Sequence, residues 1–274
     1  MLLDIGASFL KWQIGNEYHE ERFMGNITQL QNTMWTEDVY IATQANAFVD
    51  QHGNIHNWGY EPTKEDIPLE EWLKRNTTVK YVGNDYEMAV YGADLHEGEI
   101  LLNLGTGGQA TMFGVEQCYE QLTIHGQRYT TIRYIPCGKI LARLNHLLNV
   151  DVYGWINMYH LSDIDLQGLS CNPAWHEMQS KYPGSFKGIT LENFTSEKII
   201  QTTFMGILTS FNNAIKDLCF QTPFVFPPNV KLAGGIAEKC PLVQEYFHQY
   251  YKNVEIIPHA TFRGLERIMK EGIP

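Results

Sequence analysis

The sequence predicts an α/β protein with two compact lobes. Its 274 residues are 44% hydrophobic and 19% charged, which is enough apolar material for a sizeable core. Short apolar runs that end in glycine turns, such as residues 101–108, are typical of strands. Residues 196–220 repeat apolar side chains every three or four positions, a pattern that predicts a long core helix.

Charge and cysteine content narrow the classes of function. Lys and Arg number 20 against 31 Asp and Glu, a net charge of -11, so we expect small-molecule or protein partners, no nucleic acid and no membrane surface. Five cysteines without a paired short spacing argue against a disulfide framework and a zinc ribbon. The first residues lack the basic and apolar segments of a signal peptide, so we expect a cytoplasmic protein.

The first predicted element is a hairpin with an acidic residue in its first strand. Residues 2–5 form an apolar run, 6–8 can turn tightly, and 9–14 read as the returning strand. Asp4 interrupts the apolar run, and a buried carboxylate requires a partner. A hydrated Mg²⁺ ion is one such partner, and N–H groups of the turn are the other. Lys11 could face a phosphate or could simply be a solvated strand residue.

A second strand-like stretch covers residues 39–49 and carries two polar side chains. Gln44 and Asn46 are two residues apart, so on a strand they share one face and could line a polar pocket. His52 and His56 have the spacing of zinc ligands on a helix, but the Gly-Asn between them favours a turn, so the prediction of a metal site there is weak.

Residues 81–95 combine a short strand with a helix. A short helix is also expected at 69–74, and Gly83 then ends the next strand. Asn84 or Asp85 can cap the helix that follows. Asp85 therefore has two interpretations. It is either a helix cap, or a carboxylate at the mouth of a cleft that accepts a proton from a substrate hydroxyl.

The stretch LLNLGTGGQATM, residues 101–112, places a glycine-rich turn between two short strands. Backbone N–H groups and the hydroxyl of such a turn can converge on an anion, which makes it a candidate phosphate loop. An ordinary hairpin turn is the alternative, because short glycine-rich matches are weak evidence. The loop residues are Gly105, Thr106, Gly107 and Gly108.

The C-terminal half contains further predicted strands and helices. Two adjacent glycines between a strand and a helix would let a flat base or a phosphate approach the backbone. The expected elements are a strand at 129–134, a helix at 138–148, loops at 155–193, the helix at 196–220, a strand at 230–233, the turn Gly234-Gly235 and a helix at 241–251.

The order of these motifs resembles the FGGY family of carbohydrate kinases, nearly end to end. The motifs are Asp4-Ile5-Gly6 with Lys11, the strand before Gln44, Gly83-Asn84-Asp85, Gly105 to Gly108, and Gly234-Gly235. Residues 103–109 and 133–148 look most like sedoheptulokinases within that family. The resemblance implies two actin-like (ribonuclease H-like) lobes, each a mixed sheet flanked by helices, with ATP in the cleft between them. The expected division is a shortened lobe at 1–94, with the acceptor site and the base, and a nucleotide-binding lobe at 95–274.

Carried over to this sequence, the family pattern gives each motif a role. Asp4 would bind Mg²⁺, and Asp85 would be the catalytic base. ATP would be held near its transferred phosphate by Gly6, Ala7, Ser8 and Lys11, at its β- and γ-phosphates by Gly105, Thr106, Gly107 and Gly108, and on the adenosine side by Gly234 and Gly235. The acceptor would meet Gln44, Asn46, Trp58 and Asn84.

The sequence also departs from the family, and the departures concern the acceptor. Only a short segment separates Trp58 from Val82, where family members carry a large part of the first lobe. We therefore expect an ATP-dependent kinase for a small sugar or polyol, without assigning the sugar. A pantothenate kinase-like enzyme, similar in length, and a catalytically inactive nucleotide- or sugar-binding regulator remain alternatives. The high aromatic content, with 15 Tyr and 13 Phe, suggests self-association, in the simplest case as a homodimer.

Overall fold

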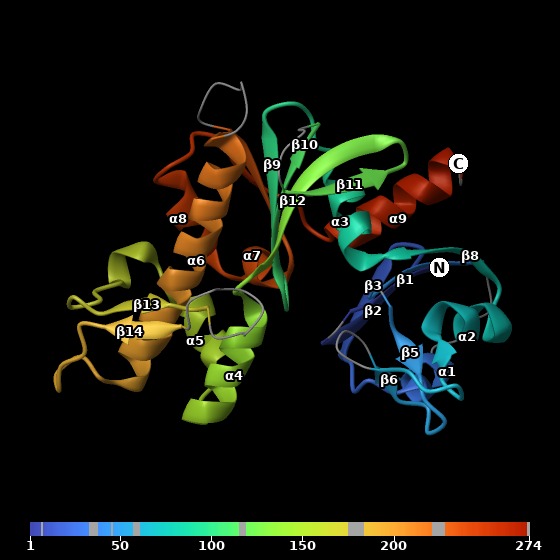
Figure 1. The fold of residues 1–274 in the computed structure, drawn as a ribbon, viewed down its shortest axis with the longest axis horizontal. Coiled ribbons are helices and arrows are strands. Elements are labelled where there is room, and N and C mark those ends of the chain that lie inside the picture. Colours follow the sequence, from blue (N-terminus) through green and yellow to red (C-terminus); the bar gives the residue numbers. More distant parts are fainter. Residues whose placement is uncertain are drawn as a thin grey trace. The chain divides into compact units, whose positions relative to one another are not determined.

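The computed structural model describes residues 1–6, 8–32, 38–44, 46–56, 61–114, 119–174, 184–220 and 228–272. The chain divides into two compact units (Figure 1). The first contains residues 1–94 and 259–274, and the second contains 95–258. The expected boundary had placed residues 259–274 in the second lobe. They join the first unit because the C-terminal helix α9 (Ala260–Glu271) packs closely against α3 (Asp85–Ala93).

The first unit is built on a mixed five-stranded sheet. Its order is β3 (Glu17–Arg22), β2 (Phe9–Ile14), β1 (Leu2–Ile5), β4 (Val39–Thr43) and β8 (Val79–Asn84). Strands β1, β2 and β3 are antiparallel neighbours, whereas β1, β4 and β8 run parallel. The predicted returning strand at 9–14 is confirmed.

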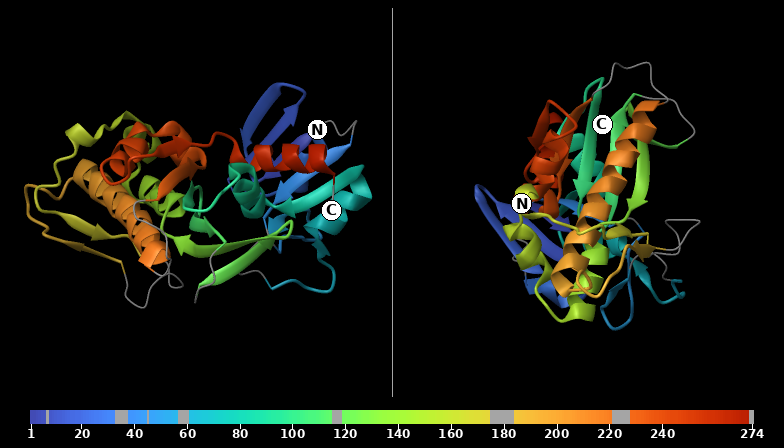
Figure 2. Two further views of the ribbon diagram at one scale, coloured as in Figure 1. Left: turned by 90° about the horizontal axis from the view of Figure 1, so that it is seen from above. Right: turned by 90° about the vertical axis from the view of Figure 1, so that its left-hand side faces the viewer.

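Helices cover both faces of this sheet. One face carries Leu3, Ile5 and Ile41, which pack against the two short helices α1 (Ile27–Asn32) and α2 (Leu69–Asn76). The opposite face carries Leu2 and Asp4. Helix α9 lies on that face, because the Tyr18 ring, on the same side as Leu2, contacts Phe262 at a ring-centroid distance of 5.7 Å. Figure 2 shows α9, in red, beside the strands of the first unit.

A small antiparallel sheet completes the first unit. It consists of β5 (Phe48–Val49) between β6 (Ile55–His56) and β7 (Ile67–Pro68). Strand β4 ends at Thr43, so residues 39–49 are not one strand. Asn46 has a positive φ of 55° and is exposed, so the argument that Gln44 and Asn46 share one strand face is wrong.

The second unit contains a mixed six-stranded sheet. Its order is β11 (Glu120–Ile124), β12 (Gln127–Ile135), β10 (Gly108–Phe113), β9 (Glu99–Leu104), β15 (Asn229–Ala233) and β16 (Val254–Ile256). Strands β9, β10, β12 and β11 pair antiparallel in that spatial order, so β12 lies between β10 and β11, and β15 pairs parallel with both β9 and β16.

Helix α6 (Ser196–Phe220) supplies much of the core of this unit, and its predicted bounds are confirmed. The predicted helix α4 (Gly138–Leu148) is confirmed as well. Other helices are α5 (Val152–Met158), the 3₁₀ turn η1 (Leu161–Asp163), α7 (Gly235–Lys239) and α8 (Pro241–His248).

The expectation of loops at 155–193 was only partly right. A short hairpin forms there from β13 (Ser170–Asn172) and β14 (Ser185–Lys187), because β13 packs against α6. Gly206 makes that approach possible, since a Cβ at this position would lie 2.6 Å from the carbonyl oxygen of Cys171. Among the described helices, none combines the length and apolar character needed to cross a membrane.

Candidate functional site

Three parallel strands of the first unit end at one edge of the sheet and bring predicted site residues together. Asp4 lies on β1, Gln44 directly follows β4, and Asp85 directly follows β8. The pairing of Asp4 with Ala42 and of Ala42 with Gly83 aligns these ends. Ligands of open α/β sheets bind outside the carboxyl ends of parallel strands. We call Asp4, Lys11 and Asp85 the carboxylate site.

Asp4 is buried, with only 7% of its surface exposed. Its Oδ1 atom has no hydrogen-bond partner within the described part of the chain. Burial raises the pKa of Asp4 to about 6. The charge of Lys11, its cross-strand neighbour on β2, opposes this shift, and Glu20 adds to it. A buried carboxylate oxygen with an unmet hydrogen-bonding capacity is well suited to a cation.

Asp85 opens α3 but does not cap it. The Asn84 Oδ1 atom accepts hydrogen bonds from the backbone N–H groups of Tyr86, at 2.9 Å, and Glu87, at 3.4 Å, so Asn84 is the cap. Asp85 stands at the first helical position, and its Oδ1 accepts a bond from Tyr86 N at 2.7 Å. Burial, followed by the charge of Asp4, raises the pKa of Asp85 to about 7.

The turn after β1 connects these groups to the rest of the hairpin. Gly6 N donates to the carbonyl oxygen of Phe9 at 3.0 Å, and the Ser8 carbonyl oxygen accepts from Phe23 N at 2.9 Å. The hairpin places Lys11 directly opposite Asp4. Two predicted residues, Ala7 and Trp58, lie outside the described residues.

The glycine-rich turn of the second unit joins β9 to β10 and contacts the start of α4. The carbonyl oxygens of Gly105 and Thr106 accept hydrogen bonds from Gly138 N, at 3.0 Å, and Lys139 N, at 2.8 Å. Gly138 must be glycine, because a Cβ there would lie 2.6 Å from the Gly105 oxygen. The first N–H groups of α4 are thus used by the loop, and an anion would instead meet the loop itself. Thr106 and Gly107 are exposed at its tip.

Gly234 and Gly235 lie next to this turn, since β9 and β15 are parallel and end at the same edge of the sheet. Gly234 has a positive φ of 93°, and a Cβ on it would lie 2.6 Å from the carbonyl oxygen of Leu104. A Cβ on Gly235 or on Gly107 would meet nothing within 4 Å. The structure therefore separates glycines that the packing requires from glycines that leave an open approach to the backbone. We call Gly105 to Gly107 with Gly234 and Gly235 the glycine site.

Sequence reasoning gave Gly138 and Asn103 no part in this site. Asn103 Nδ2 donates to Gln109 Oε1 at 3.4 Å, and a Cβ on Gly234 would lie 2.7 Å from Asn103 Oδ1. The sequence did contain a signal for Gly138, because glycine is enriched just after the end of a helix, whereas Gly138 begins α4. No sequence signal identified the Gly105 oxygen as its close neighbour.

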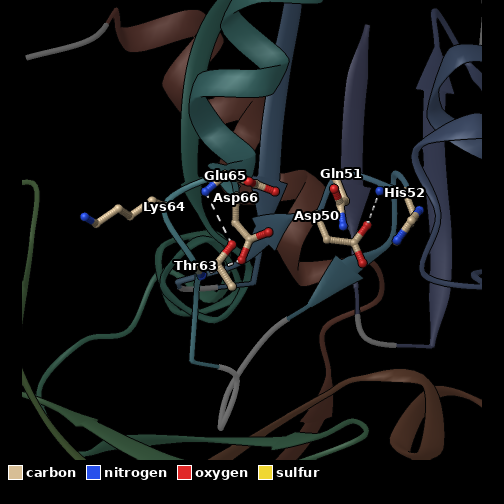
Figure 3. Close-up of a pocket in the computed structure, with 7 residues that line it drawn as sticks. All are labelled: Asp50, Gln51, His52, Thr63, Lys64, Glu65 and Asp66. Atoms are coloured by element: carbon tan, nitrogen blue, oxygen red, sulfur yellow. Dashed lines mark hydrogen bonds between the residues drawn. The ribbon is translucent and has the colours of Figure 1, made fainter.

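A hollow of about 350 Å³ in the first unit has a different character (Figure 3). Residues Asp50 to His52 and Thr63 to Asp66 line it. The Asp50 carboxylate accepts bonds from the backbone N–H groups of His52 and Asn54, both at 2.8 Å, and contacts His56 Nε2 at 2.9 Å. These hydrogen bonds hold the pKa of Asp50 well below its usual range, and the bond with His56 has the largest effect. In this geometry Asp50 organises a turn, and both His52, through its backbone N–H, and His56, through Nε2, contact the Asp50 carboxylate.

Comparison with known proteins reveals similarity in structure but not in sequence. No protein-family model and no curated protein sequence matches the chain. Glycerol kinase from Plasmodium falciparum, solved with ADP, matches with a TM-score of 0.62 and 12% identity over 100% of this chain and 90% of that chain. Xylulose kinase from Rhodospirillum rubrum matches with a TM-score of 0.62 and 10% identity over 98% of this chain and 89% of that chain.

A third match covers less of the related protein. Xylulose kinase from Bifidobacterium adolescentis has 18% identity and a TM-score of 0.53 over 71% of this chain and 41% of that chain. Identities this low establish the fold alone. The predicted fold class is confirmed, because the chain has two mixed sheets flanked by helices and matches kinases of the actin-like ATPase fold over nearly its full length.

Proposed function

We propose that this protein is an ATP-dependent kinase that phosphorylates a hydroxyl group of a small sugar or polyol. The observation that carries the proposal is the pair Asp4 and Asp85, two carboxyl groups of raised pKa at one edge of one sheet. Phosphoryl transfer needs positive charge on the phosphate oxygens, N–H donors for the developing charge, and a carboxylate that takes the proton. The chain supplies a candidate for each requirement.

Asp4 is the candidate ligand of Mg²⁺. Its buried Oδ1 lacks a partner in the described residues, and burial makes the ionised form costly without a cation nearby. The described residues contain no group of three or more His, Cys, Asp or Glu side chains that could hold a metal by themselves. Mg²⁺ fits such a place because it is often bound through one or two carboxylates, waters and substrate phosphates. When bound, it would neutralise charge on the phosphates.

Asp85 is the candidate general base. Asn84 already caps α3, so the Asp85 carboxylate is not needed for that purpose. A pKa of about 7 matches the working range of a general base, which must be ionised before the reaction and able to take a proton during it. Lys11 would orient a transferring phosphate and moderate the repulsion between the two carboxylates. Gln44 follows β4 at the same edge and would contact the acceptor.

The glycine site is the candidate nucleotide site. Gly107 and Gly235 leave the backbone accessible, which suits the close approach of phosphates and of the adenosine part of ATP. The fold is shared with a xylulose kinase and a glycerol kinase, which supports a polyhydroxylated acceptor. The resemblance of residues 103–109 and 133–148 to sedoheptulokinases supports the same class.

A ligand screen followed by a transfer assay tests the proposal. ATP with MgCl₂ at about 100 times its Kd should stabilise the protein by about 2.7 kcal/mol, which corresponds to a rise in Tm of roughly 5 to 10 °C. ADP formation should then require an acceptor from a panel of xylulose, sedoheptulose, glycerol and pantothenate. Asp4→Asn is the matched control and should lose the Mg²⁺-dependent part of the shift.

The outcomes separate the candidate functions. Transfer to pantothenate alone would favour the pantothenate kinase-like enzyme. Binding of ATP without transfer to any acceptor would favour the inactive regulator. A protein that Mg²⁺ and ATP do not stabilise would contradict the proposal as a whole.

A further inference from the structure

We propose that Gly264, on the C-terminal helix α9, is a positioning residue for Asp85. The inference rests on the proposed function for its catalytic consequence, whereas the contact itself stands independently. Asp85 begins α3, so any element that fixes the first turn of α3 also fixes the place of the Asp85 carboxylate.

The backbones of α3 and α9 touch at a pair of glycines. A Cβ on Gly264 would lie 2.1 Å from the carbonyl oxygen of Met88 and 3.1 Å from its Cα. A Cβ on Gly92 would lie 2.0 Å from the carbonyl oxygen of Ala260 and 2.5 Å from Gly264 N. These are backbone atoms, which cannot rotate away as the end of a side chain can. The two helices can cross this closely only because both positions are glycine.

Gly264 meets α3 at the turn that carries the proposed base. Met88 follows Asp85 by three residues, and positions three apart lie on neighbouring parts of a helix surface. Helix α9 is itself anchored on the sheet, where its Phe262 ring packs against Tyr18 and the helix contacts β1 and β4. The first turn of α3 is therefore held against a helix that rests on the strand of Asp4.

Arg267 holds the other end of α3 to the same helix. Its Nη1 atom donates to the Tyr91 carbonyl oxygen at 2.7 Å and to Asp94 Oδ1 at 2.8 Å. The guanidinium group also lies over the Tyr91 ring, 4.1 Å from its centroid, and the Tyr91 hydroxyl donates to Glu271. Helix α9 thus contacts both ends of α3, and these two contacts together prevent α3 from tilting.

A methyl group at position 264 must therefore move the two helices apart. An ordinary carbon contact needs about 3.5 Å, so a Cβ that would lie 2.1 Å from the Met88 oxygen requires a separation of more than about 1 Å. A misplacement of about 1 Å at a reacting group can cost roughly 10²-fold in rate. ATP affinity should stay nearly unchanged, because the change separates α3 from α9 without altering the strands of Asp4 and Lys11, and because the glycine site belongs to the second unit.

The test compares Gly264→Ala with Leu73→Ala. Leu73 is fully buried on α2, and its core lies on the sheet face opposite α9. The Leu73→Ala substitution should therefore lower the stability of the first unit without changing a contact of α3. At a temperature where both variants are folded, Gly264→Ala should lose about 10²-fold in kcat with the KM for ATP unchanged, and Leu73→Ala should keep its kcat. A Gly264→Ala enzyme with wild-type kcat overturns the proposal.

Two further measurements keep the test decisive. Amide exchange at Tyr86 to Met88 should speed up at least tenfold in Gly264→Ala relative to Leu73→Ala, and unchanged exchange overturns the proposal even if the wild type proves inactive. An inactive wild type would by itself contradict only the proposed function. If Gly264→Ala fails to fold, Arg267→Gln replaces it and should lower kcat about tenfold at constant KM for ATP, with partial recovery in Arg267→Lys. An unaltered kcat in Arg267→Gln overturns the proposal.

Discussion

Asp4 and Asp85 are separated by a single strand in the first sheet, and the charge of Asp4 helps to raise the pKa of Asp85. Strand β4 lies between β1 and β8. Its Ala42 pairs with Asp4 on one side and with Gly83 of β8 on the other. The Tyr81 ring lies over Gly83, where a Cβ would be 2.7 Å from the Tyr81 hydroxyl oxygen, so this phenol borders the face between the two carboxylates. Without a cation, each carboxylate makes the other harder to ionise.

Replacing Asp85 tests its proposed role as a base. Asp85→Asn keeps the size of the side chain and should lower kcat by about 10² to 10⁴ with ATP affinity nearly unchanged, because a general base acts only as the proton leaves. Steady-state kinetics and ATP titration measure the two effects. Asp85→Ala should behave in the same way, since Asn84 supplies the cap in both variants. An Asp85→Asn enzyme with normal turnover would remove the residue from the catalytic list.

The stability of the protein should depend on pH through the same residue. An unfolded Asp ionises near pH 4, whereas the Asp85 pKa is raised to about 7 in the folded protein. Between these values the folded state binds more protons, so its stability relative to Asp85→Asn is greatest below pH 4 and is lost as the pH rises through 7. Near pH 8, without Mg²⁺, Asp85→Asn should be the more stable protein by about 2 to 4 kcal/mol. Urea unfolding of both proteins at pH 4 to 8 measures this difference, and a constant difference would refute the raised pKa.

Gly235 provides the sharpest test of the nucleotide site. Gly235→Val should abolish ATP binding and leave the fold intact, because a Cβ there meets nothing within 4 Å. Gly234→Ala is the matched control. It places a side chain at a φ of 93° and 2.6 Å from the Leu104 oxygen, so it should lower Tm strongly. Calorimetric titration and thermal unfolding separate the two results, and unchanged ATP affinity in a folded Gly235→Val variant would rule out this nucleotide site.

The cap of α3 predicts a loss of stability when Asn84, the residue before Asp85, is replaced. Asn84→Ala removes the acceptor of the Tyr86 and Glu87 N–H groups and should cost about 1 kcal/mol of stability. Asn84→Asp should retain most of that stability in the cap, since Asp is an equally good N-cap residue. Denaturant midpoints of the two variants check the assignment. An Asn84→Ala protein as stable as the wild type would show that Asn84 does not cap the helix.

The sequence predicted the elements whose signals are local. The apolar spacing of residues 196–220 determines one face of a helix, and the bounds of α6 follow it. The first hairpin and the glycine turn between β9 and β10 were predicted for the same reason, because a tight turn and its flanking strands lie within a few residues. The order of these motifs also predicted the actin-like kinase fold.

Contacts between distant segments decided the rest. Phe262, Leu265 and Ile268 are apolar and three residues apart, a spacing that could have predicted α9. No local pattern predicts that this helix packs on α3. Which of Asn84 and Asp85 caps α3 depends on where β8 ends, and β8 runs as far as its pairing with β4 extends. The raised pKa of Asp4 likewise arises from burial and the charge of Glu20, and that of Asp85 from burial and the charge of Asp4, and none of these effects exists until the sheet has formed. The sequence by itself determined the local elements and their order, whereas the tertiary structure alone decided their neighbours, because packing and electrostatics act between residues far apart in the chain.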